Sequence, residues 1–261
     1  MVSLYDYPKY YEMIFGERNI RQEVGFLVTL IKKYSKIKVS SVLDIACGSG
    51  IQIVELAKLG FKVAGLDSSP KMIEELKRNM RTKPNFIAAY REDMSSFTLP
   101  RKFDSCICML NSLEILIKNK QFISHFESVA KCLKPGGVYI IELDNPAFIL
   151  SLPSPGAGIK EYRKGIKRGE IEIDVVYRRF PFDLLRFVEK NELILNINDK
   201  GKKLRIVDDS PVRRLTPSDI NLFVKLNKKF ELVTLLGGFD FNTTINNKSS
   251  KKMIVVLRRI T

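Results

Sequence analysis

Strand-like and helix-like patterns alternate along the first 145 residues, and this alternation restricts the possible fold more than any other feature. Short apolar runs predict the strands, and helical periodicity or helix-start signals separate them. The predicted strands are 41–46, 61–66, 86–90, 105–110 and 137–143; the predicted helices are 17–35, 51–59, one opening at Ser69 and Pro70, and 121–133. Strands joined by helices through short connections form parallel sheets covered on both faces. The sequence therefore predicts a doubly wound α/β domain.

The pattern changes after Asn145. Strand-like stretches at 171–178, 185–196 and 203–206 follow without a strong helix between them, which predicts an antiparallel β insertion. A helix signal returns at Thr216, and two final strands, 230–235 and 252–258, are expected to rejoin the first sheet. We therefore predict one domain built from residues 1–145 and 213–261, and an insertion over 146–212.

Length and composition are those of an ordinary globular protein. The 261 residues allow one large domain, or one domain with an elaboration, at roughly 150 residues per domain. Apolar runs such as Met253 to Leu257 fall far short of the roughly 18 residues of a membrane span. The N-terminal segment lacks a basic region followed by an apolar stretch, so no secretory signal is expected. We predict a cytoplasmic protein.

The formal net charge of +15 is the unusual quantity in the composition. Residues 1–150 carry a net charge of +5 and residues 151–261 a net charge of +10. Such an excess is compatible with a nucleic-acid partner, an anionic substrate or membrane surface, or a lysine-rich exterior. The basic run over 160–168 is interrupted by Glu161, and such runs are usually solvated faces.

The strongest local motif is VLDIACGSG over residues 42–50. An apolar strand ends in Asp44, and glycines at 48 and 50 allow the backbone to pass close to a ligand before the next helix begins. A dinucleotide-binding fingerprint requires a third glycine at position 53, where the sequence has Ile53. The motif therefore favours a ligand without phosphates, and Asp44 suits a ligand that carries an ammonium group.

The ends of three further predicted strands carry residues that could contact a ligand. Asp67 follows the second strand, 23 positions after Asp44, where a carboxylate can accept hydrogen bonds from both hydroxyls of a ribose. Glu92, Asp93 and Met94 follow the third strand, and the segment 109–111 follows the fourth. Because open α/β sheets bind ligands at the carboxyl ends of their strands, these segments are expected to converge on one crevice.

In their order and spacing, these motifs resemble those of class I S-adenosylmethionine-dependent methyltransferases. VLDIACGSG resembles the first motif, AGLDSSPKMIEELKRN the ribose-binding second, REDM the adenine-binding loop, and LKPGGVYIIEL the segment that leads into the fifth strand. The YDYPKYYEMIF, RRLTPSDI and GFDF segments are similar to small-molecule members, including sugar N,N-dimethyltransferases with an antiparallel insertion after the fifth strand. The resemblance implies a Rossmann-like, seven-stranded sheet and S-adenosyl-L-methionine as cofactor.

The resemblance also implies a role for individual residues. The methionine part of the cofactor would contact Asp44, Ala46, Gly48 and Gly50, and Tyr11 with Arg18 or Arg21 would close over it. The ribose would contact Asp67, with Ser68 beside it. The adenine amine would contact Asp93, the adenine ring would contact the Met94 backbone, and Met109 and Leu110 would cover the adenosyl group. We expect the insertion to act as a lid over the acceptor, with Asn111 in the acceptor pocket.

The function predicted on this basis is methyl transfer to a nitrogen or oxygen nucleophile of a small molecule. A general base is needed only for a hydroxyl acceptor, and Tyr11, Glu142 and Asp144 are the candidates for it. The concentration of positive charge around and beyond the insertion favours an anionic acceptor. RNA or protein methylation through the basic second part is an alternative, as is a non-catalytic cofactor-binding scaffold. The oligomeric state is left open.

The remaining reactive side chains have structural interpretations. His125 falls inside a predicted helix beside apolar positions and is expected to be packed or at the surface. The four cysteines are expected to be reduced core thiols, and no metal site is predicted. Tyr5, Tyr7 and Tyr10 are expected to pack against the first helix.

Overall fold

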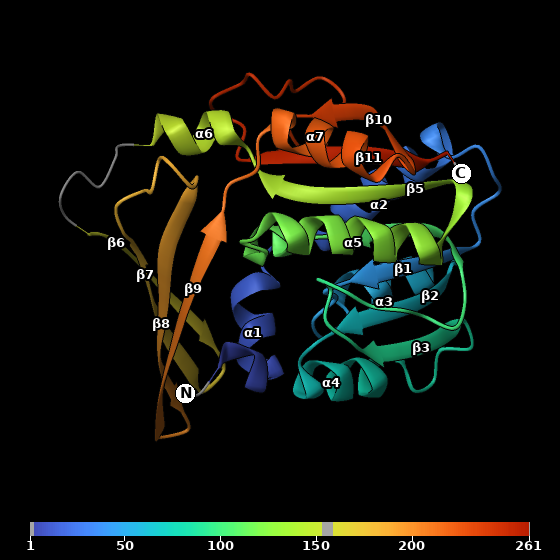
Figure 1. Ribbon diagram of the computed structural model, residues 1–261. Coiled ribbons are helices and arrows are strands. Elements are labelled where there is room, and N and C mark those ends of the chain that lie inside the picture. The colour runs from blue at the N-terminus through green and yellow to red at the C-terminus, as the bar shows by residue number, and fades with distance from the viewer. Residues whose placement is uncertain (1–2, 153–158, 261) are drawn as a thin grey trace.

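A computed structural model describes residues 3–152 and 159–260 of the chain and shows a central sheet of seven strands (Figure 1). The strand order is β10-β11-β5-β4-β1-β2-β3. The strands are β1 (Ser41–Ile45), β2 (Lys62–Asp67), β3 (Phe86–Arg91), β4 (Phe103–Cys108), β5 (Leu133–Asp144), β10 (Phe230–Leu236) and β11 (Lys252–Arg259). Strands β1 to β5 pair in parallel, and β11 pairs antiparallel with both β5 and β10. The predicted fold class and the return of the last two strands to the first sheet are confirmed.

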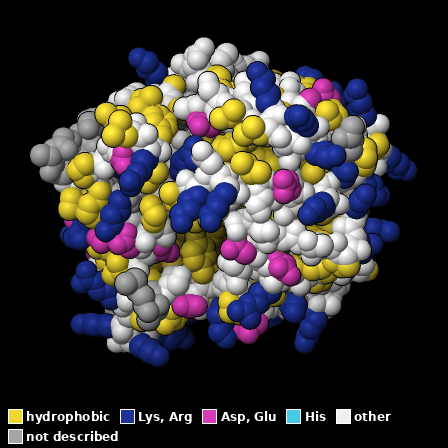
Figure 2. Space-filling view, in the orientation of Figure 1, with side chains coloured by type: hydrophobic (Ala, Val, Ile, Leu, Met, Phe, Trp, Pro, Cys, Tyr) yellow, Lys and Arg dark blue, Asp and Glu magenta, His cyan; other side chains and the backbone are white. Residues whose placement is uncertain are grey.

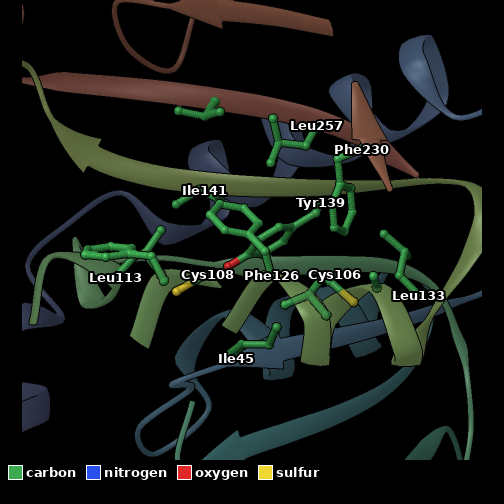
Figure 3. Packing of buried hydrophobic residues seen from close by; sticks show 14 of the residues in the cluster. Ile45, Cys106, Cys108, Leu113, Phe126, Leu133, Tyr139, Ile141, Phe230 and Leu257 are labelled. Carbon is green, nitrogen blue, oxygen red and sulfur yellow. The ribbon is translucent and has the colours of Figure 1, made fainter. Parts of the chain in front are cut away.

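Helices cover both faces of this sheet. They are α1 (Pro8–Phe15), α2 (Ile20–Tyr34), α3 (Ile51–Lys58), α4 (Pro70–Met80), α5 (Asn119–Cys132), α6 (Pro146–Ser151) and α7 (Pro217–Asn227). One core packs Phe126 of α5 and Phe223 of α7 against strand residues such as Tyr139 (Figure 3). The other core packs α2, α3 and α4 against the opposite face, for example through Leu27 and Leu56. The sheet is therefore buried on both sides, as its near-continuous apolar strands require.

A second sheet of four antiparallel strands follows β5 and α6. Its strands, in spatial order, are β6 (Lys160–Arg168), β7 (Ile171–Arg179), β8 (Val188–Asp199) and β9 (Lys202–Arg213). The short 3-10 helix η1 (Leu4–Asp6) and α1 pack onto this sheet, because Leu4, Tyr10 and Met13 share a core with its residues. Figure 1 shows α1 lying between the two sheets. The N-terminal segment thus fills the junction between them.

Several elements differ from the sequence-based expectation: α1 and α6 were not predicted, β9 is longer than the predicted strand 203–206, and α2 and β6 differ as follows. The region expected as one helix over 17–35 begins only at Ile20, because Gly16 ends α1 and Asn19 caps α2. Strand β6 was interpreted as a solvated charge run; it is an edge strand whose charged side chains are mostly exposed, with only Ile166 buried. An edge strand has one unpaired edge in solvent, and most of the side chains of β6 are exposed as well, so its sequence shows little alternation of apolar and polar residues. Residues 153–158 of the predicted insertion lie outside the described residues.

The histidine and the cysteines have the structural places expected of them. His125 is fully buried, with Nδ1 2.8 Å from the Met94 carbonyl oxygen and Nε2 2.8 Å from the Tyr139 hydroxyl. Burial lowers the pKa of His125 to about 4, so the ring is neutral at pH 7. All four cysteines are free and buried, which confirms them as core thiols. His125 fixes the carbonyl of Met94, at the loop that follows β3.

Positively charged side chains are spread widely over the face shown in Figure 2. A hollow near the middle of this face exposes hydrophobic side chains, with acidic side chains beside it. Among the described residues, no helix has both the length and the apolar character that crossing a membrane requires.

Candidate active site

The turn between β1 and α3 adopts backbone conformations that its small residues permit. Ala46, Gly48 and Gly50 all have positive φ angles, of 56°, 54° and 87°. The Gly48 N–H donates to Asp67 Oδ2 at 2.8 Å, and the Ser69 N–H donates to Asp67 Oδ1 at 2.9 Å. Asp67 therefore ties the glycine turn to the beginning of α4. Burial raises the pKa of Asp67, against the backbone N–H groups that lower it.

A cavity of about 490 Å³, here called the first cavity, opens above this turn at the carboxyl ends of the parallel strands. Eight of the residues predicted to bind a cofactor line it: Tyr11, Ala46, Gly48, Asp67, Ser68, Asp93, Met94 and Leu110. These residues come from α1 and from the ends of β1, β2, β3 and β4. The structure thus brings most of the predicted set together in one place.

Four other predicted residues are not among the described residues that line the first cavity. Gly50 caps α3, and Met109 is 3% exposed within the core on the α2 side. Arg18 pairs with Glu142 and with Glu23, both at 2.8–2.9 Å. Asp44 is 1% exposed, and its Oδ2 has no hydrogen-bond partner among the described residues. Burial, together with the nearby Asp67, raises the pKa of Asp44.

Several lining residues were not predicted from the sequence. The additional residues of the first cavity are Ser3, Tyr5, Asp6, Phe15, Leu66, Ser69, Pro70, Ser112, Ile115, Leu116 and Gln121; Glu92, which was expected near the crevice because it follows the third strand, lines the cavity too. Tyr5 was expected only to pack against the first helix, yet it lines a ligand-sized space. Its ring lies 5.8 Å from the Tyr11 ring. The concentration of tyrosines near the N-terminus was the available signal, although it does not reveal which of them face a cavity.

A second cavity of about 210 Å³ adjoins the first, since Tyr5, Phe15, Leu110 and Ile115 line both. Its other walls come from distant parts of the chain. They are Leu4, Asn111, Glu114, Asp144, Tyr177, Asn191, Leu193, Asp208, Ser210, Val212 and Arg214. Six of these residues belong to β7, β8 or β9, so the antiparallel sheet closes one side of this space.

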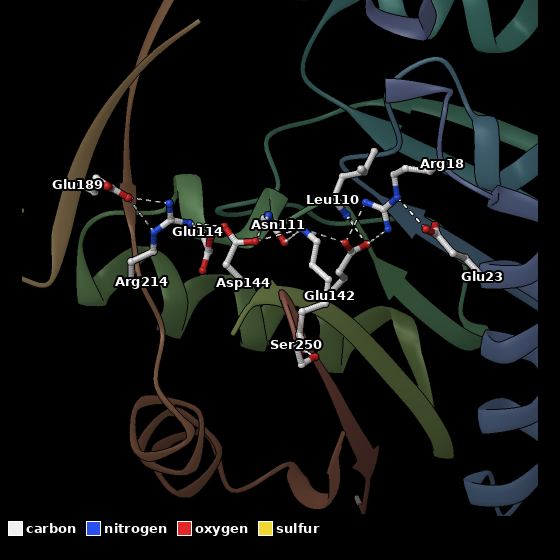
Figure 4. Close-up of polar contacts among 11 residues, drawn as sticks. Arg18, Glu23, Leu110, Asn111, Glu114, Glu142, Asp144, Glu189, Arg214 and Ser250 are labelled. Atoms are coloured by element: carbon white, nitrogen blue, oxygen red, sulfur yellow. Dashed lines mark hydrogen bonds and ion pairs between the residues drawn. The ribbon is translucent and has the colours of Figure 1, made fainter. Parts of the chain in front are cut away.

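A chain of ion pairs runs beneath the second cavity and links the two sheets (Figure 4). The Arg214 guanidinium pairs with Glu189 of β8 at 2.8 Å, Glu114 at 2.8 Å and Asp144 of β5 at 2.5 Å. Lys252 of β11 continues the chain from Asp144 to Glu142. Because each of these charges is largely buried, its partners are needed to offset the cost of removing it from water.

The surroundings of the predicted base candidates Glu142 and Tyr11 differ, as do those of Asn111, which was predicted to lie in the acceptor pocket. Glu142 is fully buried; its ion pairs with Lys252 and Arg18 outweigh burial and lower its pKa, and Oε2 accepts the Leu110 N–H at 3.0 Å. Burial raises the pKa of Tyr11 and keeps its hydroxyl protonated. Asn111, which lines the second cavity, donates to Asp144 at 2.8 Å. Glu142 is therefore engaged by two cations and one backbone N–H, and Tyr11 is suited to contact a ligand rather than to remove a proton.

Residues 42–137 match the family model described as a methyltransferase domain. This range contains the glycine turn, Asp67 and the loop after β3 that surround the first cavity. Over these residues the chain resembles methyltransferase domains. A solved S-adenosylmethionine-dependent methyltransferase from Clostridium acetobutylicum shares the fold of the whole chain, with a TM-score of 0.80, 18% identity, and coverage of 97% of this chain and 96% of that one.

Several sequence relatives of this chain are named N-methyltransferases. Glycine N-methyltransferase of Rattus norvegicus is 32% identical over 148 residues, covering 52% of this chain and 50% of the relative. A dTDP-3-amino-3,6-dideoxy-alpha-D-glucopyranose N,N-dimethyltransferase of Streptomyces fradiae is 30% identical over 125 residues, covering 48% and 47%. The chain thus spans about half the length of these relatives. Streptomyces venezuelae DesVI shares the fold with a TM-score of 0.76, 20% identity, and coverage of 95% and 96%.

Proposed function

We propose that this protein is an S-adenosylmethionine-dependent methyltransferase whose acceptor is a nitrogen or oxygen nucleophile of a small molecule, with an amine favoured. The observation that carries the proposal is the pair of adjoining cavities. The first lies at the glycine turn of the methyltransferase domain, and the second shares four wall residues with it. A donor in the first cavity and an acceptor in the second would meet at Tyr5, Phe15, Leu110 and Ile115.

The residues of the first cavity fit the chemical groups of S-adenosylmethionine. Asp44 does not itself line the first cavity but precedes the glycine turn that does; its buried Oδ2 has no hydrogen-bond partner among the described residues, and the ammonium group of the cofactor would supply one. Asp67, already fixed by two backbone N–H groups, retains further lone pairs for ribose hydroxyls. Asp93 and Met94 lie at the wall where an adenine amine and ring would contact the loop after β3.

The chain's own contribution to the reaction is positioning and the exclusion of water. When bound, S-adenosylmethionine supplies a methyl group on a sulfonium, which is already a strong electrophile. Tyr5 and Phe15, from the N-terminal segment, line the region that the two cavities share, and strands β7, β8 and β9 line the acceptor side. Holding donor and acceptor in line converts a bimolecular step into an effectively unimolecular one, which is a large part of the rate gain available here.

An amine acceptor is supported by the charge of the second cavity. Three carboxylates, those of Glu114, Asp144 and Asp208, line it together with one guanidinium, that of Arg214, among the described residues. The basic strand β6 lies elsewhere, and several of its cations pair with acidic neighbours, such as Lys167 with Glu172. Several sequence relatives are named N-methyltransferases, which also supports an amine acceptor.

Calorimetric titration with S-adenosylhomocysteine tests the proposal. We expect one site per chain in the wild type and an affinity at least about 10-fold weaker in Asp67→Ala, because a charged hydrogen-bond acceptor contributes about 1.5–3 kcal/mol. Asp209→Ala, an exposed carboxylate change on β9, serves as the control and should bind like the wild type. Absence of binding to the folded wild type, or equal binding by Asp67→Ala, would contradict the proposal.

The other sequence-based proposals give different outcomes in a methylation assay. An RNA or protein acceptor predicts label in the macromolecular fraction, with a steep salt dependence for RNA. A non-catalytic scaffold predicts cofactor binding without transfer to any fraction. An anionic acceptor, which the net charge alone favours, predicts a product retained by an anion exchanger. Two further proposals come from the sequence: residues 146–212 act as a lid over the acceptor, and the protein is located in the cytoplasm.

A further inference from the structure

One carboxyl group of the second cavity differs from the others in its surroundings. Glu114 lies in the 3-10 helix η2 (Ser112–Ile115), directly after β4, and is fully buried. Its Oε2 accepts a hydrogen bond from Arg214 Nη1 at 2.8 Å. Its Oε1 is buried and has no hydrogen-bond partner among the described residues, although Glu114 lines the second cavity. One oxygen is therefore held by Arg214, while the other has no partner among the described residues.

The neighbours of Glu114 explain why its Oε1 has no protein partner in the described part of the chain. Arg214 is shared among three carboxylates, since it also pairs with Asp144 and Glu189. The charged or titratable groups around Glu114 are Tyr5 of η1, Asp144 of β5, Tyr177 of β7, Asp208 of β9, Arg214, and Lys252 of β11. Burial raises the pKa of Glu114 to about 8, against the opposing effect of Arg214. A cation brought beside Oε1 would stabilise the ionised form.

We propose that Oε1 of Glu114 is the general base that removes a proton from the acceptor amine in the second cavity. The proposal rests on the proposed methyl transfer and adds to it a residue that the sequence did not single out. An alkylammonium donates to Oε1 and, nearby, to the free Oδ1 of Asn191 and to Asp208, which line the same cavity. All three are acceptors, which matches a group that has only N–H bonds to donate.

The proton and electron balance of the step is complete. The ammonium proton passes to Glu114 Oε1, which leaves a neutral amine with a free lone pair. That lone pair forms the new N–C bond to the donor methyl, while the C–S bond breaks and its electron pair returns to sulfur. The product is a methylated ammonium and a neutral thioether. Arg214 is a positioning residue in this step, because it holds Oε2 and leaves Oε1 without a hydrogen-bond partner among the described residues.

Glu114→Gln, Glu114→Asp and a matched control, Asp209→Asn, test this role. The substrate is the amine fraction of a cell extract, retained on a cation exchanger, with methyl-labelled S-adenosylmethionine as donor. At pH 7 we expect the initial rate of Glu114→Gln to fall by at least about 100-fold, as for loss of a general base. At pH 10, where neutral amines predominate, the deficit should shrink below about 10-fold. Asp209→Asn should follow the wild type at both pH values.

Two results would overturn the proposal: an undiminished rate for Glu114→Gln at pH 7, or a deficit that is the same at pH 7 and pH 10, as a structural role predicts. Binding of S-adenosylhomocysteine reports folding. If Glu114→Gln no longer binds S-adenosylhomocysteine, the Glu114→Asp variant is used instead. A methylation rate of Glu114→Asp above one-tenth of the wild-type rate supports Glu114 as the general base, and an equal loss of rate at pH 7 and pH 10 overturns that role. Failure of the wild type to bind S-adenosylhomocysteine instead contradicts the proposed function.

Discussion

The two adjoining cavities are built in different ways. Most of the first is formed by short segments that follow consecutive parallel strands, and a backbone turn with positive φ angles supplies its floor. The second is assembled where two sheets meet, from η1, η2, the end of β5 and three strands of the antiparallel sheet. The first depends on local backbone geometry, whereas the second depends on a network of buried charges.

Under the proposed function, this difference separates recognition of the methyl donor from recognition of the acceptor. Changes to the glycine turn or its supports should weaken cofactor binding, and changes to the charge network should affect stability and the acceptor while leaving cofactor binding intact in the folded protein. Four perturbations, described in order of decreasing expected effect, test whether cofactor binding and acceptor binding depend on different residues.

Arg214→Met should cause the largest loss of stability, about 3–5 kcal/mol in the free energy of unfolding. Removal of the buried guanidinium leaves Glu114, Asp144 and Glu189 without their common cation, and an uncompensated buried charge is strongly destabilising. Urea denaturation measures the effect. Arg205→Met, an exposed change on β9, should stay within about 0.5 kcal/mol of the wild type. A loss below about 1 kcal/mol for Arg214→Met would refute the role of the network.

The stability contributed by His125, which supports the first cavity through Met94, should depend on pH. The pKa of His125 is lowered to about 4 in the folded state, so between pH 6.5 and pH 4 only the unfolded chain binds the proton. The stability of the wild type relative to His125→Gln should therefore fall as pH decreases, by up to about 1.4 kcal/mol per unit. Urea denaturation of both proteins at pH 7 and pH 5 measures this; a constant difference would show that His125 is not held neutral.

Gly65→Ala should destabilise the support of the glycine turn by about 1–3 kcal/mol and weaken S-adenosylhomocysteine binding. The new Cβ would lie 2.6 Å from atoms of Cys47, Ile53 and Leu76, so the packing must shift. Gly25→Ala is the matched control, because open space surrounds its Cβ on helix α2 and the change should add about 0.5–1 kcal/mol of stability. Thermal unfolding and calorimetry check both; wild-type stability in Gly65→Ala would contradict the packing argument.

Asp208→Asn should have the smallest effect, raising the acceptor KM about 5-fold with little change in S-adenosylhomocysteine affinity. Asp208 is partly exposed in the second cavity, so its attraction for an ammonium is about 1 kcal/mol. Steady-state kinetics on the amine fraction measure the KM, and Asp209→Asn is again the control. Weaker cofactor binding without a change in the acceptor KM would reverse the proposed division.

The same difference explains what could be predicted from the sequence. The fold class and most of the first cavity were predictable, because Asp67, Asp93 and the glycine turn lie at fixed places relative to strands with a clear apolar pattern. The second cavity was not predictable, because no local sequence pattern connects Glu114 with Arg214. Arg214 is 100 positions away in the sequence and contacts Glu114 only in the folded structure. Strand β6 was missed because its side chains remain mostly exposed.

Methyl-labelled S-adenosylmethionine, offered with the small molecules, RNA and protein of a cell extract, tests the central claim most directly. We predict that the wild type places label in small-molecule amines, that Asp67→Ala reduces this at limiting donor, and that acetylation of the amines beforehand abolishes it. Label confined to RNA or protein, label unaffected by both Asp67→Ala and acetylation, or no transfer at all would contradict a donor in the first cavity and an amine in the second.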